Sequence, residues 1–201
     1  MLRVGLTGGL ASGKSFVGRT LEGFGCHWIR ADDLGHAVIA PDGEACQAVA
    51  AEFGTGILAA DGAIDRKKLG AIVFADPARL ARLNALVHPH VFARQESLLA
   101  GIEARDARAI AVVEAAIMIE TGSHRRYQKL IVAVCPEWMQ IERAIARDGL
   151  TRQQVADRLS RQIPLKEKAG MADYVIDTSI SPEETVRQTQ NVYQALRSLQ
   201  P

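Results

Sequence analysis

Residues 8–15 read Gly-Gly-Leu-Ala-Ser-Gly-Lys-Ser and follow an apolar run at residues 2–6. Two glycines that enclose four residues, followed by Lys-Ser, are typical of a phosphate-binding loop between a strand and a helix. The glycines let the backbone turn so that its N–H groups surround an anion, and the following helix adds its positive N-terminus. Lys14 supplies a charge for the β- and γ-phosphates, and the Ser15 hydroxyl can bind Mg²⁺. The sequence therefore predicts a nucleotide polyphosphate site with a metal ion.

The composition favours one compact domain in the cytoplasm. The chain has 201 residues, 48% of them apolar, and a formal net charge of +1, so its charge does not indicate binding to nucleic acid or acidic lipid. Cys26, Cys46 and Cys135 are scattered and lack metal-ligand spacing, which favours reduced thiols and no zinc site. No apolar stretch approaches the ~20 residues that span a bilayer, and the first strand leaves no room for a signal peptide. We therefore expect a cytoplasmic location, without a membrane or nucleic-acid partner.

Short apolar runs alternate with helical segments along the chain. This alternation predicts an α/β fold, with a five-stranded parallel sheet covered by helices on both faces. The expected strands are residues 2–7, 26–30, 109–113, 129–135 and 174–176. Within a single domain, residues 1–33, 106–136 and 169–201 would then form the nucleotide-binding core.

Two segments are too long to be simple connections between strands. Residues 34–105 are mostly helical in pattern, with breaks that include His88-Pro89, where the proline favours a helix end. In the second segment, residues 137–168, Thr151 and Gln154 have the spacing of a capping box at a helix start. We expect an inserted helical subdomain at 34–105 and a smaller insertion at 137–168.

Acidic residues follow two of the expected strands, Asp32 after the second and Glu114 after the third. Ligands of open parallel sheets lie beyond the carboxyl ends of the strands, so both should lie near Lys14. Asp32 could accept a proton from a hydroxyl group or orient it, and Glu114 could bind Mg²⁺ through water. As an alternative, Asp32 caps a helix that begins near Leu34, a role that its neighbour Asp33 could equally take. Glu114 could equally be structural.

Basic residues are concentrated between 143 and 168. Arg143 and Arg147 are four residues apart and share a helix face. A mobile flap that carries such arginines over a nucleotide would stabilise the transferring charge and exclude water. A solvated basic face is the alternative. Likewise, His88 could be purely structural, and Arg66 could pair with a neighbouring aspartate.

Motifs along nearly the whole chain resemble those of the dephospho-CoA kinase family. They are Gly-Leu-Thr-Gly-Gly-x-x-Ser-Gly-Lys-Ser at 5–15, Ala31-Asp32, Gly-Ala-Ile-Asp-Arg at 62–66, Leu-Gly-x-Ile-Val-Phe at 69–74, Asp76-Pro77, Leu-Asn-x-x-x-His-Pro at 83–89, Gln140 with Arg143, Arg-Asp-Gly at 147–149, Arg158 with Gln162, and Ala-Asp-Tyr-Val-Ile-Asp at 172–177. The phosphate loop alone identifies only a superfamily, whereas the Ile-Asp-Arg and Leu-Asn…His-Pro segments are much more specific.

The resemblance implies a kinase with the P-loop nucleoside-triphosphate hydrolase fold. It would transfer the γ-phosphate of ATP, bound with Mg²⁺, to the ribose 3′-hydroxyl of dephospho-CoA, giving CoA and ADP in the final step of coenzyme A biosynthesis. The subdomain at 34–105 would bind CoA, and residues 137–168 would form a lid.

The resemblance also implies roles for individual residues. The implied catalytic residues are Asp32, Lys14, Arg143 and Arg147. Those implied to bind ATP are Gly8, Gly9, Leu10, Ala11, Ser12, Gly13, Lys14, Ser15, Phe16, Arg143, Asp177 and Thr178, with the adenine near 177–180. Those implied to bind dephospho-CoA are Asp32, Arg66, His88 and Glu120.

Four positions depart from the family pattern. Arg30 replaces the first acid of Asp-Ala-Asp, Phe16 replaces a threonine after the loop, Ala116 replaces a proline, and Thr178 replaces the asparagine after Val-Ile-Asp. None of these changes removes the phosphate loop or the catalytic aspartate that the resemblance implies.

Three other functions remain as alternatives: another small-molecule kinase, a nucleotide-binding switch or ATPase, and an impaired descendant of the kinase, suggested by Arg30. The Ile-Asp-Arg and Leu-Asn…His-Pro segments argue against another kinase. The sequence contains neither the Asn-Lys-x-Asp expected of a GTPase nor the Leu-Ser-Gly-Gly-Gln expected of a transporter-type ATPase.

Overall fold

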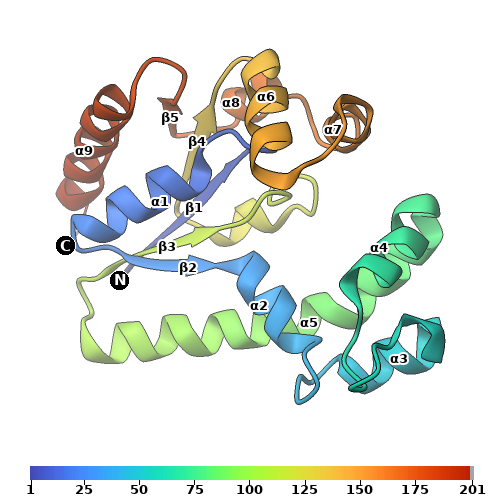
Figure 1. The fold of residues 1–201 in the computed structure, drawn as a ribbon. Coiled ribbons are helices and arrows are strands. Elements are labelled where there is room, and N and C mark those ends of the chain that lie inside the picture. The colour runs from blue at the N-terminus through green and yellow to red at the C-terminus, as the bar shows by residue number, and fades with distance from the viewer. Residues whose placement is uncertain (200–201) are drawn as a thin grey trace. The chain divides into compact units, whose positions relative to one another are not determined.

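A computed structural model describes residues 1–199 of the chain (Figure 1). Five strands form a sheet in the order β2-β3-β1-β4-β5, and every neighbouring pair is parallel. The strands are β1 (Leu2–Gly8), β2 (His27–Arg30), β3 (Ile110–Glu114), β4 (Lys129–Val134) and β5 (Tyr174–Asp177). The predicted five-stranded parallel sheet is confirmed.

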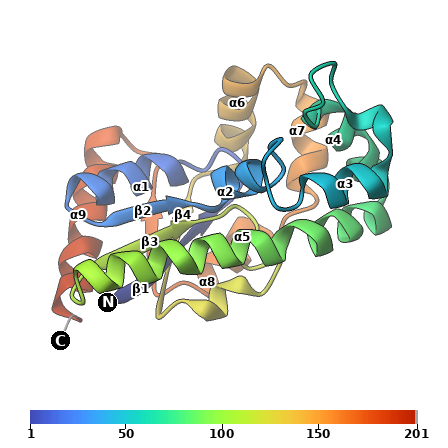
Figure 2. The ribbon, with the colours of Figure 1, turned by 90° about the horizontal axis from the view of Figure 1, so that it is seen from below.

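Helices cover both faces of this sheet because the strands are apolar on both sides. On one face, alternate residues such as Leu6 and Ile131 pack against α1 (Lys14–Gly23) and α9 (Pro182–Ser198), which lie side by side (Figure 2). On the opposite face, Leu130 and Val132 pack with side chains from the loop after β3 and from the region of α8 (Leu165–Gly170). Each fully buried branched side chain contributes about 1.5–3 kcal/mol to folding, so these two layers stabilise the sheet.

The strand register places the carboxyl ends of the strands at one edge. Glu114 is paired with Leu6 of β1 and with Arg30 of β2, while Gly8 at the end of β1 is paired with Ala133 of β4. The phosphate loop leaves the sheet at this edge, immediately after the central strand β1. Polar groups at the ends of β3 and β4 are therefore neighbours of the loop.

Two further helices follow β4. They are α6 (Glu137–Asp148) and α7 (Arg152–Leu159), which share a small apolar core. The predicted capping box at the start of α7 is confirmed: Gln154 N donates to Thr151 Oγ1 at 3.2 Å, and Thr151 N donates to Gln154 Oε1 at 2.9 Å. A short 3-10 helix, η2 (Ser123–Arg126), precedes β4.

Residues 31–100 form a second compact unit with its own apolar core, separate from the unit made by residues 1–30 and the chain from 101 onward. Its elements are α2 (Ala31–Val38), α3 (Cys46–Phe53), the 3-10 helix η1 (Thr55–Ile57), α4 (Arg66–Ala75) and most of α5 (Pro77–Arg105). Helix α2 begins at Ala31 rather than near Leu34, so Asp32 and Asp33 lie in its first turn.

The expected helix end at His88-Pro89 is wrong, because α5 continues through Pro89 to Arg105. Proline removes one backbone hydrogen bond and crowds the preceding turn, at a cost of about 3 kcal/mol. The packing on both sides of it offsets this cost: Leu86 and Val87 before the proline and Val91 after it belong to the core of the 31–100 unit. Tertiary burial thus outweighs the local preference.

The three cysteines are all buried and free, as predicted for reduced thiols. Burial raises the pKa of the Cys26 thiol to about 12 and also raises that of Cys135. Among residues 1–199, no helix combines the length and apolar character needed to cross a bilayer.

We predict that His88 makes the 31–100 unit less stable in mild acid. Partial burial lowers the pKa of its imidazole below the ordinary value of 6.5. Between the lowered pKa and 6.5 the unfolded chain binds more protons than the folded chain, so the free energy of unfolding decreases as pH falls through this window. Urea unfolding from pH about 7.5 to about 5.5 should show this decrease, and it should be smaller in His88→Gln.

The matched control is His36→Gln, because His36 is an exposed histidine of the same unit. It should keep the pH dependence of the parent chain. If His36→Gln and His88→Gln reduce the pH dependence of the unfolding free energy equally, the role of His88 would be contradicted.

Candidate functional site

The phosphate loop turns sharply at Gly13, whose backbone has φ +84°. Only glycine adopts this conformation without strain, and a Cβ atom here would lie 2.9 Å from the side chain of Thr178. Thr178 is itself buried, and its hydroxyl lies 2.9 Å from the carbonyl oxygen of Ser12, to which it can donate. The last turn of the loop is thus packed directly against the residue that follows β5.

The middle of the loop is also tightly packed. A Cβ atom on Gly9 would lie 2.1 Å from Gln140 Oε1 of α6, so this glycine allows α6 to approach the loop backbone. Ala11 adopts φ +52°, a left-handed conformation that costs a non-glycine residue roughly 1–2 kcal/mol. The fold therefore maintains a strained loop conformation, as functional loops often require.

Two loop side chains contact specific partners. Lys14 is buried and its Nζ donates to the carbonyl oxygen of Gly9 at 2.7 Å. Ser15 Oγ donates to Glu114 Oε1 at 2.7 Å, and the other carboxylate oxygen accepts a 3.1 Å bond from Trp28 Nε1. Glu114 thus joins the end of the loop to the ends of β2 and β3, with two neutral donors on its carboxylate.

Arg143 and Arg147 of α6 both line the pocket of about 460 Å³ that the loop forms with this helix. Arg143 is fixed by Thr178: Nη1 donates to Thr178 Oγ1 at 3.0 Å and Nη2 to the Thr178 carbonyl at 2.8 Å. Arg147 is more exposed and makes a two-point ion pair with Asp148, whose pKa it lowers. The pocket therefore combines loop backbone with two guanidinium groups, a suitable environment for a polyphosphate.

Phe16 lines both this pocket and a neighbouring one of about 340 Å³, as do Gly13 and Arg143. The second pocket is completed by the chain from Thr178 to Pro182, including the exposed side chain of Ile180. Exposed aromatic and aliphatic groups beside a polar pocket are typical of a site for a planar base.

Asp177 has a different environment from the other residues expected to bind ATP. Its Oδ1 accepts a 2.8 Å bond from Ser179 N, which stabilises the turn after β5, and the residue lines a third pocket with Cys135 and Lys166. Its carboxylate therefore shapes the turn that carries Thr178.

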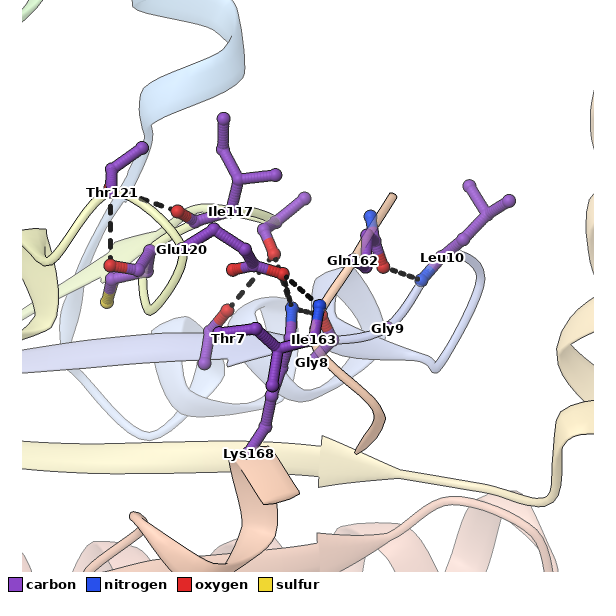
Figure 3. A network of polar contacts seen from close by, with 12 residues as sticks. Thr7, Gly8, Gly9, Leu10, Ile117, Glu120, Thr121, Gln162, Ile163 and Lys168 are labelled. Carbon is purple, nitrogen blue, oxygen red and sulfur yellow. Dashed lines mark hydrogen bonds and ion pairs between the residues drawn. The ribbon is translucent and has the colours of Figure 1, made fainter. Parts of the chain in front are cut away.

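Glu120 forms a buried ion pair that the sequence analysis missed. Its Oε1 lies 2.6 Å from Nζ of Lys168, which is fully buried, and accepts a 3.0 Å bond from Ile163 N (Figure 3). The sequence offers no signal for this pair, because nothing near Lys168 distinguishes it from its exposed neighbour Lys166.

The remaining expected site residues lie in the 31–100 unit. Asp32 is exposed in the first turn of α2, where helix geometry favours an acid, but the helix begins before it and it is not the N-cap. Arg66 is exposed at the start of α4, whose N-cap is Asp65. His88 is half-buried in α5, with its ring centroid 5.8 Å from that of Phe92. The roles of all three stay predictions.

The chain can also be compared with known proteins. The family model described as dephospho-CoA kinase matches residues 2–184. A dephospho-CoA kinase of Geobacter sulfurreducens is 42% identical over 190 residues, which cover 94% of this chain and 96% of that protein. One from Thermobifida fusca is 39% identical over 197 residues, which cover 98% of this chain and 97% of that protein.

Structural similarity agrees with these sequence matches. A solved structure of dephospho-CoA kinase from Campylobacter jejuni has a TM-score of 0.72 and 25% identity, and the match covers 98% of this chain and 97% of that chain. The likeness thus covers nearly the whole chain, including residues of both compact units.

We predict that Thr178→Val weakens both the fold and ATP binding. The substitution keeps the shape but removes the hydroxyl that contacts Ser12 O and Arg143, and such unsatisfied buried partners cost about 1–3 kcal/mol. Urea unfolding should show this loss, and calorimetric titration should show weaker ATP binding. The control Thr189→Val removes a buried hydroxyl that bonds only within α9, through Thr185 O. If both variants bind ATP like the parent, Thr178 has no part in the nucleotide site.

Proposed function

This chain belongs to the dephospho-CoA kinase family, and we propose that it transfers the γ-phosphate of ATP to the ribose 3′-hydroxyl of dephospho-CoA, giving CoA and ADP. The observation that carries the proposal is the phosphate loop at residues 8–15, with Lys14 buried inside it and two arginines of α6 lining the same pocket. The match of the family model to residues 2–184 supports dephospho-CoA as the acceptor.

We propose that the ATP phosphates bind in the pocket between the loop and α6. Backbone N–H groups of the loop and the N-terminus of α1 would bind the β- and γ-phosphates, with Lys14 as a fixed charge. Arg143 and Arg147 would offset the negative charge that develops on the transferred group. The adenine would then lie in the adjoining pocket, between Phe16 and the chain that follows Thr178.

The Ser15 hydroxyl and the Glu114 carboxylate are suited to bind Mg²⁺. Both are oxygen donors, they lie 2.7 Å apart, and Mg²⁺ in phosphate sites commonly uses one or two protein oxygens together with the phosphates and water. Described residues 1–199 contain no cluster of three or more His, Cys, Asp or Glu side chains suited to a metal. When bound, Mg²⁺ would neutralise charge on the phosphates. We propose that Ser15 contacts the ion directly and that Glu114 acts through water.

We propose that Asp32 acts on the acceptor hydroxyl. It comes two residues after the carboxyl end of β2, next in the sheet to β3 with Glu114 at its end. Its carboxylate would accept the proton of the 3′-hydroxyl while the new O–P bond forms and the bond from the γ-phosphorus to the β–γ bridging oxygen breaks. Arg66 and His88 are proposed to bind dephospho-CoA, since the family resemblance assigns both positions to that substrate.

We predict that ADP formation depends on dephospho-CoA and on Asp32. Purified protein with ATP and Mg²⁺ should release ADP much faster when dephospho-CoA is added, and mass spectrometry should detect CoA. Asp32→Asn should reduce turnover by ~10²–10⁴, as for loss of a general base, with ATP affinity unchanged.

The neighbour Asp33 provides the matched control for this experiment, because it lies in the same first turn of α2. Asp33→Asn should retain near-normal turnover. A rate of ADP release that does not change when dephospho-CoA is added would refute the proposed reaction. A turnover of Asp32→Asn as high as that of Asp33→Asn would refute only the role of Asp32.

We also predict that Glu114→Gln increases the Mg²⁺ requirement. The amide retains an oxygen that can accept from Ser15 or Trp28, but the charge that attracts the ion and its water is lost. The Mg²⁺ concentration for half-maximal activity should rise about 10–100-fold, the usual effect of losing an outer-shell partner. Titration of activity with Mg²⁺ tests this, and an unchanged half-point would limit Glu114 to a structural role.

A further inference from the structure

Lys168 of α8 is a fully buried lysine, and its ammonium group is directed at the start of the phosphate loop (Figure 3). Its Nζ lies 2.6 Å from Glu120 Oε1, 3.2 Å from the carbonyl oxygen of Gly8 and 3.1 Å from the carbonyl oxygen of Ala116. An ammonium has three donors, so these contacts can use all of them. One of these three contacts is with Gly8, the first residue of the phosphate loop.

A second contact comes from the same region of the chain. Gln162, six residues before Lys168, uses Oε1 to accept a 3.0 Å bond from the backbone N–H of Leu10. Ile163, the next residue, donates its own N–H to Glu120. Residues 162–168 thus contact the first half of the loop at two points, and Glu120 connects both ends of this segment.

The bond to Gly8 fixes the direction of a peptide group. In a trans peptide the carbonyl and the N–H of the next residue point in opposite directions in one plane. Because the Gly8 oxygen is bonded to Lys168, the N–H of Gly9 must point away from α8. The anion-binding ability of such a loop depends on the directions of its N–H groups.

Stability alone gives little reason for this arrangement. A buried ion pair commonly adds no net stability over apolar side chains of similar size, because desolvation of both charges offsets their attraction. Glu120 Oε2 is in addition buried without a hydrogen-bond partner in the described part of the chain, which increases the cost. A role in placing the loop accounts for a charge at this position.

We propose that Lys168 is a positioning residue for the nucleotide: paired with Glu120, and assisted by Gln162, it orients the first peptide groups of the phosphate loop for ATP binding. This inference rests on the proposed function of the loop. It also gives Glu120 a role different from contact with dephospho-CoA.

The decisive variant replaces the pair by apolar side chains, Lys168→Met with Glu120→Leu. If the pair only stabilises the fold, this double variant should unfold at the parent temperature and bind ATP with the parent affinity. If Lys168 positions the loop, the double variant should unfold near the parent temperature yet bind ATP about tenfold more weakly, the effect of losing a charge-assisted bond. The KM for ATP should rise to a similar extent, whereas the KM for dephospho-CoA should stay unchanged.

Two further variants complete the test. Lys166→Met removes the same charge from an exposed position of α8 and should leave ATP binding unchanged. Gln162→Ala removes the contact with Leu10 without a buried charge, and it should also weaken ATP binding, which keeps the test decisive if the double variant does not fold. The inference would be overturned if the double variant folds and binds ATP as tightly as the parent. If the double variant does not fold, parent-like ATP binding by Gln162→Ala would overturn it. Failure of the parent protein to form CoA would instead refute the proposed function.

Discussion

Hydrogen bonds to the carbonyl groups of the phosphate loop help to set the directions of the opposite N–H groups, which are the groups that can bind an anion. Three of these carbonyls have side-chain partners, two from elsewhere in the core and one from Lys14 of the loop itself. Lys168 donates to Gly8, Lys14 donates to Gly9, and the hydroxyl of Thr178 lies within donating distance of Ser12. The central position of β1, with its end beside the ends of β3 and β4, makes these contacts possible. The loop conformation therefore depends on contacts with the core as well as on its own eight residues.

Two glutamates near the loop have different environments and consequently different roles. Glu114 accepts hydrogen bonds from a serine hydroxyl and an indole N–H, which are both neutral donors. Glu120 faces the ammonium group of Lys168, and its charge is compensated within the protein. The first carboxylate is suited to a metal ion bound with the phosphates, whereas the second is suited to hold a lysine in place.

The sequence allowed more of the fold to be predicted than of the site. Apolar runs and their alternation with helical segments gave all five strands, and the Thr151–Gln154 spacing gave the capping box, because these features depend on neighbours along the chain. The helix end expected at His88-Pro89 was wrong because burial of Val87 and Val91 outweighs the local effect of proline. Likewise, the expected start of α2 near Leu34 was three residues late.

The sequence by itself determined the phosphate loop, the parallel sheet and the family, since each depends on residue order and spacing. Only the tertiary structure decided which polar residues serve the loop. Thr178 departs from the family pattern and yet contacts both Ser12 and Arg143, and Lys168 differs from Lys166 only in being buried. The physical reason is that the energy of a charge or a hydroxyl depends on its desolvation and on partners far away in sequence, and both are set by packing.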